Sequence, residues 1–293
     1  MADILFTTLR LLVLSFATSS AALDTGAVKN HDMQKTEVEN EEFRRSYQFA
    51  DGSHLEVSNV AVGSFLILPT DTDTAEVQIT RSARDRADLA CGALVVEHPP
   101  TRLVIRGSDK CGSPRRDTTL TQNVILRIPR RSNVSLSDIH GPVILGEIEG
   151  RGPNFIKGPD GGRIPQPVDR PNVVGRGFSG AVRMRKIRGP IRFVQGAGNS
   201  EITDISGPLV VAVRGLGDKG LAVRNVGSIV EIILSDKLNA TLRVYDIKGR
   251  VRTGKPEGTS RRTGDINFGE QFGLGGASIT VTNVDGDVVI SRI

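Results

Sequence analysis

Apolar and polar residues alternate along this chain in short runs that end at an Asp, Asn or Lys, followed by an apolar residue and a Gly. Residues 134–145 (VSLSDIHGPVIL) and 279–290 (ITVTNVDGDVVI) share few identical residues, yet both follow h-x-h-x-(Asp/Asn/Lys)-h-x-Gly-x-h-x-h, where h is apolar. Alternation of this kind is typical of a β-strand with one buried face. The pattern therefore predicts pairs of short strands joined at a glycine turn.

The same pattern recurs at a nearly constant spacing. From Lys186 onward its Asp/Asn/Lys positions are residues 186, 204, 225, 246, 265 and 283, in steps of 18, 21, 21, 19 and 18 residues. Further copies lie near residues 55–63 and 134–145, and the copy at 265 is degenerate. A period of about 20 residues built from two strands is typical of stacked β-repeats. We therefore expect an all-β fold, a β-solenoid- or β-helix-like stack of consecutive repeats.

Each turn of this pattern has a predicted role for its two special residues. Gly is expected to supply the positive φ angle of the corner. The Asp or Asn before it is expected to hydrogen-bond nearby backbone groups and stabilise the bend.

The domain organisation follows from where the pattern begins and where it breaks. Residues 1–22 carry an apolar run and small residues near a cleavage position, which predicts a signal peptide. Residues 23–45 form a polar linker, or in part a frayed helix, and residues 46–293 form the repeat domain. Within that domain the Gly- and Pro-rich residues 150–180 predict a loop insertion. No later segment resembles a membrane span, so we expect a secreted or periplasmic protein of the cell envelope.

The two cysteines flank a predicted hairpin. Residues 94–97 and 102–106 are short β-type runs separated by His-Pro-Pro-Thr, and Pro belongs in the turn because it lacks a backbone donor. Cys91 and Cys111 lie ten residues on either side of the hairpin centre. Symmetric positions face each other in an antiparallel hairpin, so an exported chain is expected to form a Cys91–Cys111 disulfide.

The Asn-Val-x-Gly and Ile-x-Gly-x-Val repeats, the leader and the early hairpin together resemble the bacterial "putative adhesin" β-strand-repeat family. The resemblance covers roughly residues 46–293. It implies a β-solenoid and an adhesin-like role, and it carries no catalytic residues over to this chain.

The motifs in this chain that could suggest catalysis or cofactor binding are better explained as turns and surface residues. Residues 215–220 match G-x-G-x-x-G, but a strand-like run follows at once, where a dinucleotide site needs a helix. The four histidines, at 31, 54, 98 and 140, show no metal-binding spacing. No catalytic residue, cofactor or metal ligand is predicted.

Composition and charge leave a binding role open. The formal net charge is +5, and aromatic residues make up only 4% of the chain. Few aromatics and an export signal argue against a nucleic-acid partner. Basic residues concentrate in the second half of the repeats, and the candidate ligand-binding residues are Arg183, Arg185, Arg224, Arg243, Tyr245 and Arg250. They fit an anionic glycan or another envelope component; the same residues would also suit an ordinary solvated face.

The sequence thus favours an exported, non-catalytic adhesin-like protein that binds or scaffolds. Two alternatives stay open: a polysaccharide-active β-helix enzyme and an envelope-stress accessory protein. The enzyme needs clustered carboxylates on stacked strands. The predicted outward rows instead read Ser135, Arg183, Glu201, Ala222, Arg243, Thr280, and then Ser137, Arg185, Thr203, Arg224, Tyr245, Thr282.

Overall fold

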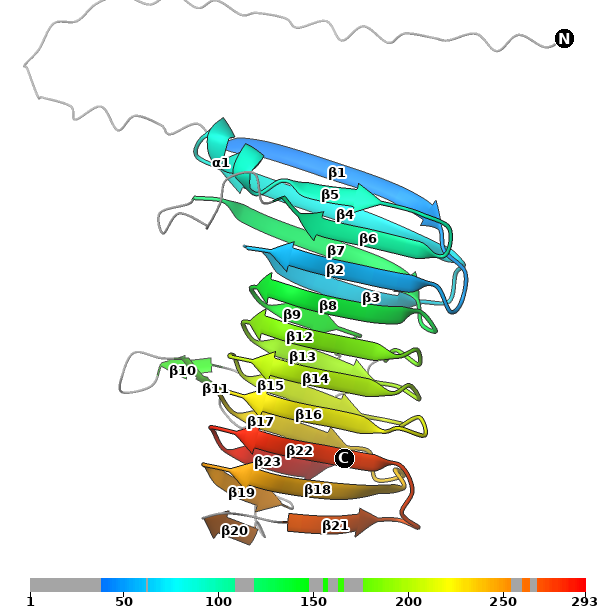
Figure 1. The fold of residues 1–293 in the computed structure, drawn as a ribbon, viewed down its shortest axis with the longest axis vertical. Coiled ribbons are helices and arrows are strands. Elements are labelled where there is room, and N and C mark those ends of the chain that lie inside the picture. Colours follow the sequence, from blue (N-terminus) through cyan, green and yellow to red (C-terminus); the bar gives the residue numbers. More distant parts are fainter. Residues whose placement is uncertain are drawn as a thin grey trace, which may run out of the picture. The chain divides into compact units, whose positions relative to one another are not determined.

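The computed structural model describes residues 38–293, except 62, 109–118, 148–154, 158–162, 166–175, 254–259 and 264–267. Two large open sheets account for most of these residues (Figure 1). The described residues contain one helix, α1 (Arg86–Cys91), whose first turn is capped by the Asp85 side chain accepting from the Asp88 N–H. The prediction of an all-β fold is confirmed.

The eleven-stranded sheet contains, in spatial order, β1 (Glu39–Gln48), β4 (Thr74–Ala83), β7 (Thr121–Pro129), β3 (Ser64–Thr70), β9 (Val143–Leu145), β13 (Ile191–Gln195), β15 (Leu209–Val213), β17 (Val230–Leu234), β23 (Val288–Arg292), β19 (Arg250–Thr253) and β20 (Ser260–Thr263).

The ten-stranded sheet contains, in spatial order, β21 (Phe268–Phe272), β18 (Ala240–Ile247), β22 (Ser278–Val284), β16 (Leu221–Val226), β14 (Ser200–Ile205), β12 (Val182–Arg188), β8 (Asn133–His140), β2 (His54–Val60), β6 (Arg102–Gly107) and β5 (Leu94–Glu97). Two short strands, β10 (Phe155–Lys157) and β11 (Arg163–Pro165), pair with each other in a separate two-stranded sheet and lie inside the predicted 150–180 insertion.

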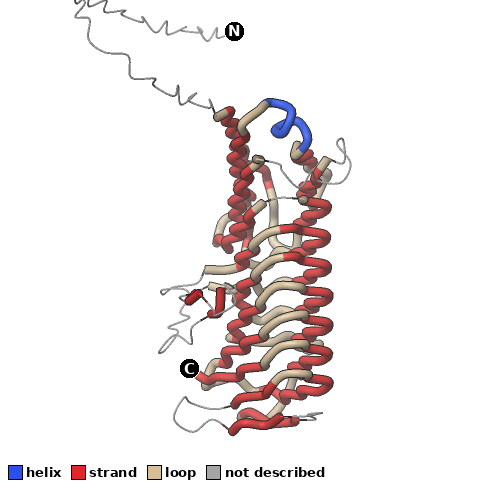
Figure 2. Tube along the Cα trace, turned by 90° about the vertical axis from the view of Figure 1, so that its left-hand side faces the viewer, coloured by secondary structure: helices blue, strands red, loops and turns tan. Residues whose placement is uncertain are grey.

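Successive strands of the repeats alternate between the two sheets. Strand β12 belongs to the ten-stranded sheet, β13 to the eleven-stranded sheet, and β14 returns to the first. Each strand pairs in parallel with its counterpart in the neighbouring repeat, so β12 lies beside β14 and β13 beside β15. We call one strand of the ten-stranded sheet with the following strand of the eleven-stranded sheet a repeat unit (Figure 2).

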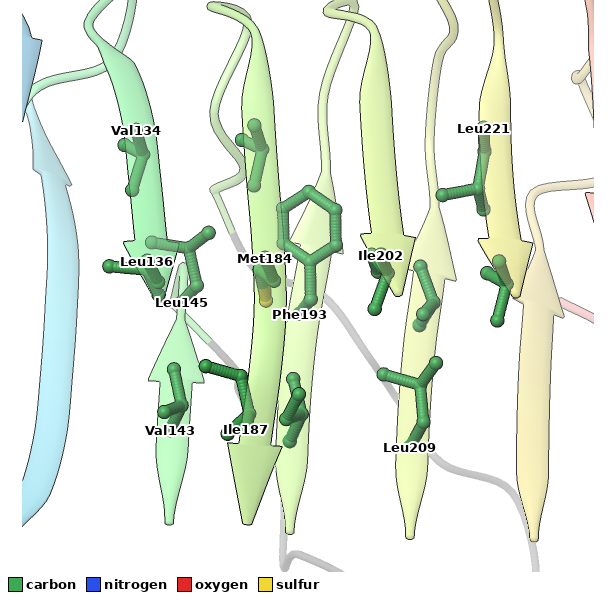
Figure 3. Packing of buried hydrophobic residues seen from close by; sticks show 14 of the residues in the cluster. Val134, Leu136, Val143, Leu145, Met184, Ile187, Phe193, Ile202, Leu209 and Leu221 are labelled. Atoms are coloured by element: carbon green, nitrogen blue, oxygen red, sulfur yellow. The ribbon is translucent and has the colours of Figure 1, made fainter. Parts of the chain in front are cut away.

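The core lies between the sheets and consists of rows of equivalent side chains (Figure 3). Leu136, Met184 and Ile202 are aligned by the register of β8, β12 and β14, and each is at most 1% exposed. Leu145 and Phe193 face them from the other sheet. Full burial of such a side chain stabilises a fold by about 1.5–3 kcal/mol. The apolar residues of the alternating pattern therefore pack together into one continuous core.

The residue with left-handed φ at each corner is the Asp/Asn/Lys position, whereas Gly was expected to supply the positive φ; among the described corner glycines only Gly141, with φ 152°, has a positive φ. The φ angles at Asn59, Asp138, Lys186, Asp204, Asn225, Asp246 and Asn283 all lie between 53° and 58°. Asn and Asp tolerate this left-handed conformation best among residues with a Cβ. A residue at this point bends the strand so that the next apolar side chain, such as Ile139 after Asp138, again faces the core.

The corner glycines are required for close approach between repeat units. A Cβ on Gly189 would overlap the carbonyl oxygen of Gly141, and one on Gly207 would overlap that of Gly189. Gly227 differs, since the nearest atom to its would-be Cβ is 3.8 Å away. This agrees with the one-residue displacement of Gly227 in the sequence pattern.

The order of repeat units in space departs from the predicted consecutive stack. Strands β22 and β23, last in the sequence, lie between the unit β16/β17 and the unit β18/β19 (Figure 1). The degenerate copy at residues 265–268 is not a stacked repeat: its Phe268 opens β21, which runs antiparallel to β18. A steadily advancing stack over residues 186–283 was therefore a wrong expectation.

At the other end of the two sheets, the order of repeat units also differs from the order in the sequence. Strands β6 and β7 pair in parallel with β2 and β3 and form a repeat unit that the sequence pattern did not reveal. The predicted antiparallel hairpin is confirmed, with Leu94 of β5 opposite Gly107 of β6. However, Cys91 ends α1 instead of extending the hairpin. Cys111 lies outside the described residues, so the Cys91–Cys111 disulfide stays a prediction.

Two predicted boundaries need correction. Residues 39–45 are not linker or frayed helix, because β1 pairs with β4 along its whole length of ten residues. The sequence hid this strand because none of its residues is buried, which removes the alternation that marks a strand. The 150–180 insertion is shorter at its end, since Phe178 is fully buried and bridges to Gln195.

Replacing Gly189 by Ala tests the corner glycines. The new methyl group would overlap the Gly141 carbonyl, and we expect the free energy of unfolding to fall by about 1–3 kcal/mol. Gly227→Ala is the matched control and should change it by no more than about 0.5 kcal/mol. Urea unfolding followed by circular dichroism measures both, and equal effects would refute this role for the glycine.

Removing residues 274–293 tests the inserted C-terminal unit. The truncation deletes the buried Ile279, Val281, Val284, Val288 and Ile290, worth on the order of 10 kcal/mol in total, comparable to the whole stability of a typical domain. We expect loss of hydrogen-exchange protection in both β16 and β18.

A synthetic peptide of residues 274–293 should restore that protection when added to the truncated chain. The same peptide carrying Val281→Asp should fail, because the charge would face the core. Full protection of β18 in the truncated chain without peptide would contradict the inserted arrangement.

Candidate binding face on the ten-stranded sheet

The outer face of the ten-stranded sheet carries two rows of outward side chains. Because alternate residues of each strand face away from the core and the strands are in register, equivalent positions line up across the sheet. The first row runs Glu56, Ser135, Arg183, Glu201, Ala222, Thr280, Arg243. The second row runs Ser58, Ser137, Arg185, Thr203, Arg224, Thr282, Tyr245.

Five of the six candidate ligand-binding residues lie on this face. Arg183 and Arg185 project from β12, Arg224 from β16, and Arg243 and Tyr245 from β18, and all five are exposed. Arg250 does not join them. It lies on β19 of the eleven-stranded sheet, where its guanidinium pairs with Asp287 at 3.0 Å.

Insertion of β22 sets the spacing within these rows. Thr280 and Thr282 separate the β18 residues from those of β16, an order that the sequence did not predict. In the second row, Arg185, Arg224 and Tyr245 are consequently two strands apart at each step, about 10 Å for strands about 4.8 Å apart. The face therefore offers evenly spaced long side chains separated by threonines.

Acidic neighbours fix some of these arginines and leave others free of ion pairs. Arg185 Nε lies 3.6 Å from Asp204 Oδ2, and Arg224 Nη1 lies 3.9 Å from Glu201 Oε1. Arg183 and Arg243 have no carboxylate within ion-pair distance in the described part of the chain. Exposed pairs of this kind contribute little stability, so each guanidinium stays available to an anionic ligand.

A ladder of polar side chains runs beside the second row, at the left-handed corner positions. Asn225 Nδ2 donates to Asp204 Oδ1 at 2.8 Å, and Asn283 Nδ2 donates to Asn225 Oδ1 at 2.8 Å. Lys186 Nζ lies 3.6 Å from Asp138 Oδ1. The ladder links repeat units that are neighbours in space and holds the corners beside the arginines in place.

Two histidines at the edges of the face respond to its charge. Burial lowers the pKa of His54 below its ordinary value, and Arg102 and Arg183 lower it further while Glu56 opposes them. Burial also lowers the pKa of His140, and Arg188 adds to that effect against Asp138. From the sequence, these histidines are notable only because they lack the spacing of metal ligands. Their position beside arginines depends on strand pairing, which no local motif shows.

The opposite outer face is chemically different. On the eleven-stranded sheet the corresponding row contains Leu66, Ile144, Arg192, Val210, Glu231 and Val289. Burial raises the pKa of Glu231 and lowers that of Arg192, which marks a partly dry surface. The outer face of the eleven-stranded sheet is thus more apolar along this row, although it also carries Arg192, Glu231 and, next to Val289, Arg252.

The rows also bear on catalysis. Their carboxylates are Glu56 and Glu201, which lie three strands apart, about 14 Å. A pair of carboxylates that cleaves glycosides lies about 5–10 Å apart.

Among the described residues no group of three or more His, Cys, Asp or Glu side chains could hold a metal ion. In the same part of the chain, no helix has the length and apolar character needed to cross a bilayer.

No protein-family model and no curated protein matches the sequence. Solved structures that align with the chain include a putative cell adhesion protein from Clostridium sporogenes, with 10% identity and a TM-score of 0.38 over 87% of this chain and 100% of that one. A putative adhesin from Parabacteroides distasonis gives 14% identity and a TM-score of 0.29 over 86% and 97% of the two chains. A putative lipid binding protein from Parabacteroides distasonis gives 11% identity and a TM-score of 0.22 over 86% and 96%. All three TM-scores lie below 0.4.

Proposed function

We propose that this chain is an exported, adhesin-like and non-catalytic binding protein of the cell envelope or its exterior. Its stacked repeat units form a β-solenoid, and the outer face of the ten-stranded sheet is its ligand-binding surface. The ligand is an anionic glycan. Export rests on the leader-like residues 1–22, and the adhesin-like role rests on the repeat motif and on the chemistry of this face.

The observation that carries the proposal is the in-register placement of four arginines and Tyr245 on one face. An arginine fork binds carboxylate or sulfate groups through two parallel hydrogen bonds, which a lysine cannot do. Serines and threonines between the arginines can donate to hydroxyl-rich ligands. The rows run across the strands, so an extended polymer with repeating negative charges would lie along the stack and meet one arginine at every second strand.

Other anionic polymers fit this surface less well. Single-stranded nucleic acid is bound by stacking its bases on aromatic side chains. Tyr245 is the one aromatic residue in the two described rows, and 36% of it is exposed. An acidic polysaccharide needs only charge, hydrogen bonds and an occasional aromatic surface, which the face provides.

Binding of polygalacturonate, an acidic polysaccharide, tests the proposal directly. Replacing Arg185 and Arg224 by Ala should raise the Kd about tenfold, because two charge-assisted contacts are lost. Added salt should weaken binding to the unaltered chain, since these charges are exposed. Isothermal titration calorimetry at low and high salt measures both effects.

The matched control is Arg127→Ala/Arg252→Ala, which removes the same charge from the eleven-stranded sheet. Its Kd should equal that of the unaltered chain. If the two double variants lose affinity equally, the ligand responds to net charge, and the proposed face is wrong. No binding at low salt would exclude acidic polysaccharide altogether.

The histidines give an independent readout of the same face. Arginine charge helps to hold the pKa values of His54 and His140 below 6.5, so a bound polyanion should raise both. Arg183→Ala alone should raise the pKa of His54, while leaving His140 unchanged. NMR titration of the histidine resonances between pH 5 and 8 measures this, at about the pH where histidine titrates.

The same shifts predict how stability depends on pH. A histidine whose pKa is lower in the folded than in the unfolded chain contributes its full stability at a pH above 6.5, the unfolded pKa. That contribution is lost as the pH falls from 6.5 through the lower folded pKa. A bound polyanion should reduce this acid sensitivity. Ligand titration that leaves both histidine resonances unmoved would place the binding site elsewhere.

A further inference from the structure

Strand β1 is a long open edge of the eleven-stranded sheet. It pairs with β4 on one side and has no strand on its other side in the described part of the chain. The other outermost strands, β5, β20 and β21, have four, four and five residues, whereas β1 has ten and contains no Pro. Proteins usually keep edge strands short or interrupted, because unpaired N–H and C=O groups recruit further strands.

Alternate residues of β1 direct their backbone N–H and C=O groups away from β4, toward the open edge. Phe49, directly after β1, donates its N–H to the carbonyl of Asp73 at 2.9 Å, so it points toward β4. In an antiparallel pair, residues that bond to the partner alternate with residues that point away. The even-numbered residues of β1, Glu42 and Arg44 among them, therefore direct their N–H and C=O groups to the open edge.

The charges of β1 have opposite sign on the two sides of Phe43. The sequence Glu41-Glu42-Phe43-Arg44-Arg45 places two acids before the aromatic residue and two bases after it. The residues of β4 opposite Arg44 and Arg45 are Gln78 and Val77, so no acid of β4 stands directly opposite either arginine. No ion pair involves either arginine in the described part of the chain.

We propose that β1 pairs antiparallel with β1 of a second copy of this chain, with the two-fold axis at Phe43. Glu42 then faces the partner's Arg44, and Glu41 faces the partner's Arg45. Both members of each pair lie on the same side of the sheet, because both are even-numbered or both odd-numbered. The interface is self-complementary, as a two-fold dimer requires, and it uses addition of a strand to an open edge.

Only this register satisfies both the hydrogen bonds and the charges. Even-numbered residues must face even-numbered residues, so the neighbouring allowed registers centre on Glu42 or on Arg44. The first places Glu42 against itself and the second places Arg44 against itself, and like charges directly opposite destabilise a sheet.

Phe43 adds an apolar contact at the axis. It is 36% exposed and lines a cleft at this end of the core together with Ile79, Leu94 and Val96. In the proposed register the two Phe43 side chains form a non-hydrogen-bonded pair, the type in which side chains approach most closely. The dimer therefore covers an aromatic residue that the single chain leaves partly in water.

Charge exchange at residues 42 and 44 tests the dimer by sedimentation velocity over a wide concentration series. Glu42→Arg places arginines opposite arginines, and Arg44→Glu places acids opposite acids, so each variant should self-associate at least about tenfold more weakly. An equimolar mixture of the two should form a heterodimer, because every facing pair is then opposite in charge. The doubly exchanged chain, Glu42→Arg/Arg44→Glu, should regain the homodimer.

A cysteine trap tests the register itself. Phe43→Cys should yield a disulfide-linked dimer under mild oxidation, since Cα atoms of a non-hydrogen-bonded pair lie about 4.5 Å apart, within disulfide range. Asn40→Cys is the control: position 40 faces the partner's Ser46, so its two sulfurs lie too far apart to bond. Circular dichroism should show the same folded spectrum for all variants.

A monomeric unaltered chain at every concentration would overturn the proposal. So would a dimer that Glu42→Arg leaves intact, charge variants that fail to associate when mixed, or equal cross-linking at positions 40 and 43. None of these outcomes depends on glycan binding, which the Arg185 and Arg224 variants test separately.

Discussion

Parallel pairing in register between repeat units is the constraint on which the rest of this structure depends. Each residue lies over its counterpart in the next unit, so a position that suits one unit must suit all of them. At the corners this requirement is strictest: the Gly141 carbonyl lies where a Cβ of Gly189 would be, and only glycine fits. One residue earlier, the same constraint demands a left-handed backbone, which even Lys186 adopts with φ 53°. A non-Gly residue in that conformation costs roughly 1–2 kcal/mol, which the stacked ladder of hydrogen bonds and the core must offset.

Because inward positions repeat along the stack, outward positions repeat as well, and this alignment is the basis of the proposed binding surface. The arginines of β12, β16 and β18 need no special loop to bring them together; the register alone aligns them. A site of this kind is long, shallow and evenly spaced. It suits an extended ligand that repeats along its own length, and it differs from the enclosed pockets that hold small molecules.

Much of this could be predicted from the sequence, for a clear physical reason. Inward rows, corner positions and outward rows follow from period-two alternation and from the repeat of about 20 residues, which are local properties of the chain. The order of units could not be predicted, because each repeat unit carries the same core pattern and can pack on any other. The strand β22, last but one in the sequence, lies between β16 and β18, and no local pattern in the sequence distinguishes these neighbours from others. The sequence also hid β1 and the unit β6/β7: the first buries no face, and a long insertion separates the two strands of the second.

The two ends of a stack of interchangeable units pose a problem that its middle does not, since an open end accepts another strand as readily as the last unit did. At the end formed by β18 and β19, short antiparallel strands stop the pairing. At the other end, β4 reverses the direction, but in the described part of the chain β1 then presents an open edge ten residues long, with opposed charges in its two halves. Antiparallel pairing of β1 about Phe43 uses a two-fold axis perpendicular to the sheet, so both copies turn the same face to the same side. The arginine rows of two chains would then face a surface together, and a polymer spanning both would bind with an effective concentration that a single chain lacks. Closure of the open edge and stronger attachment to a repetitive ligand would thus come from the same strand.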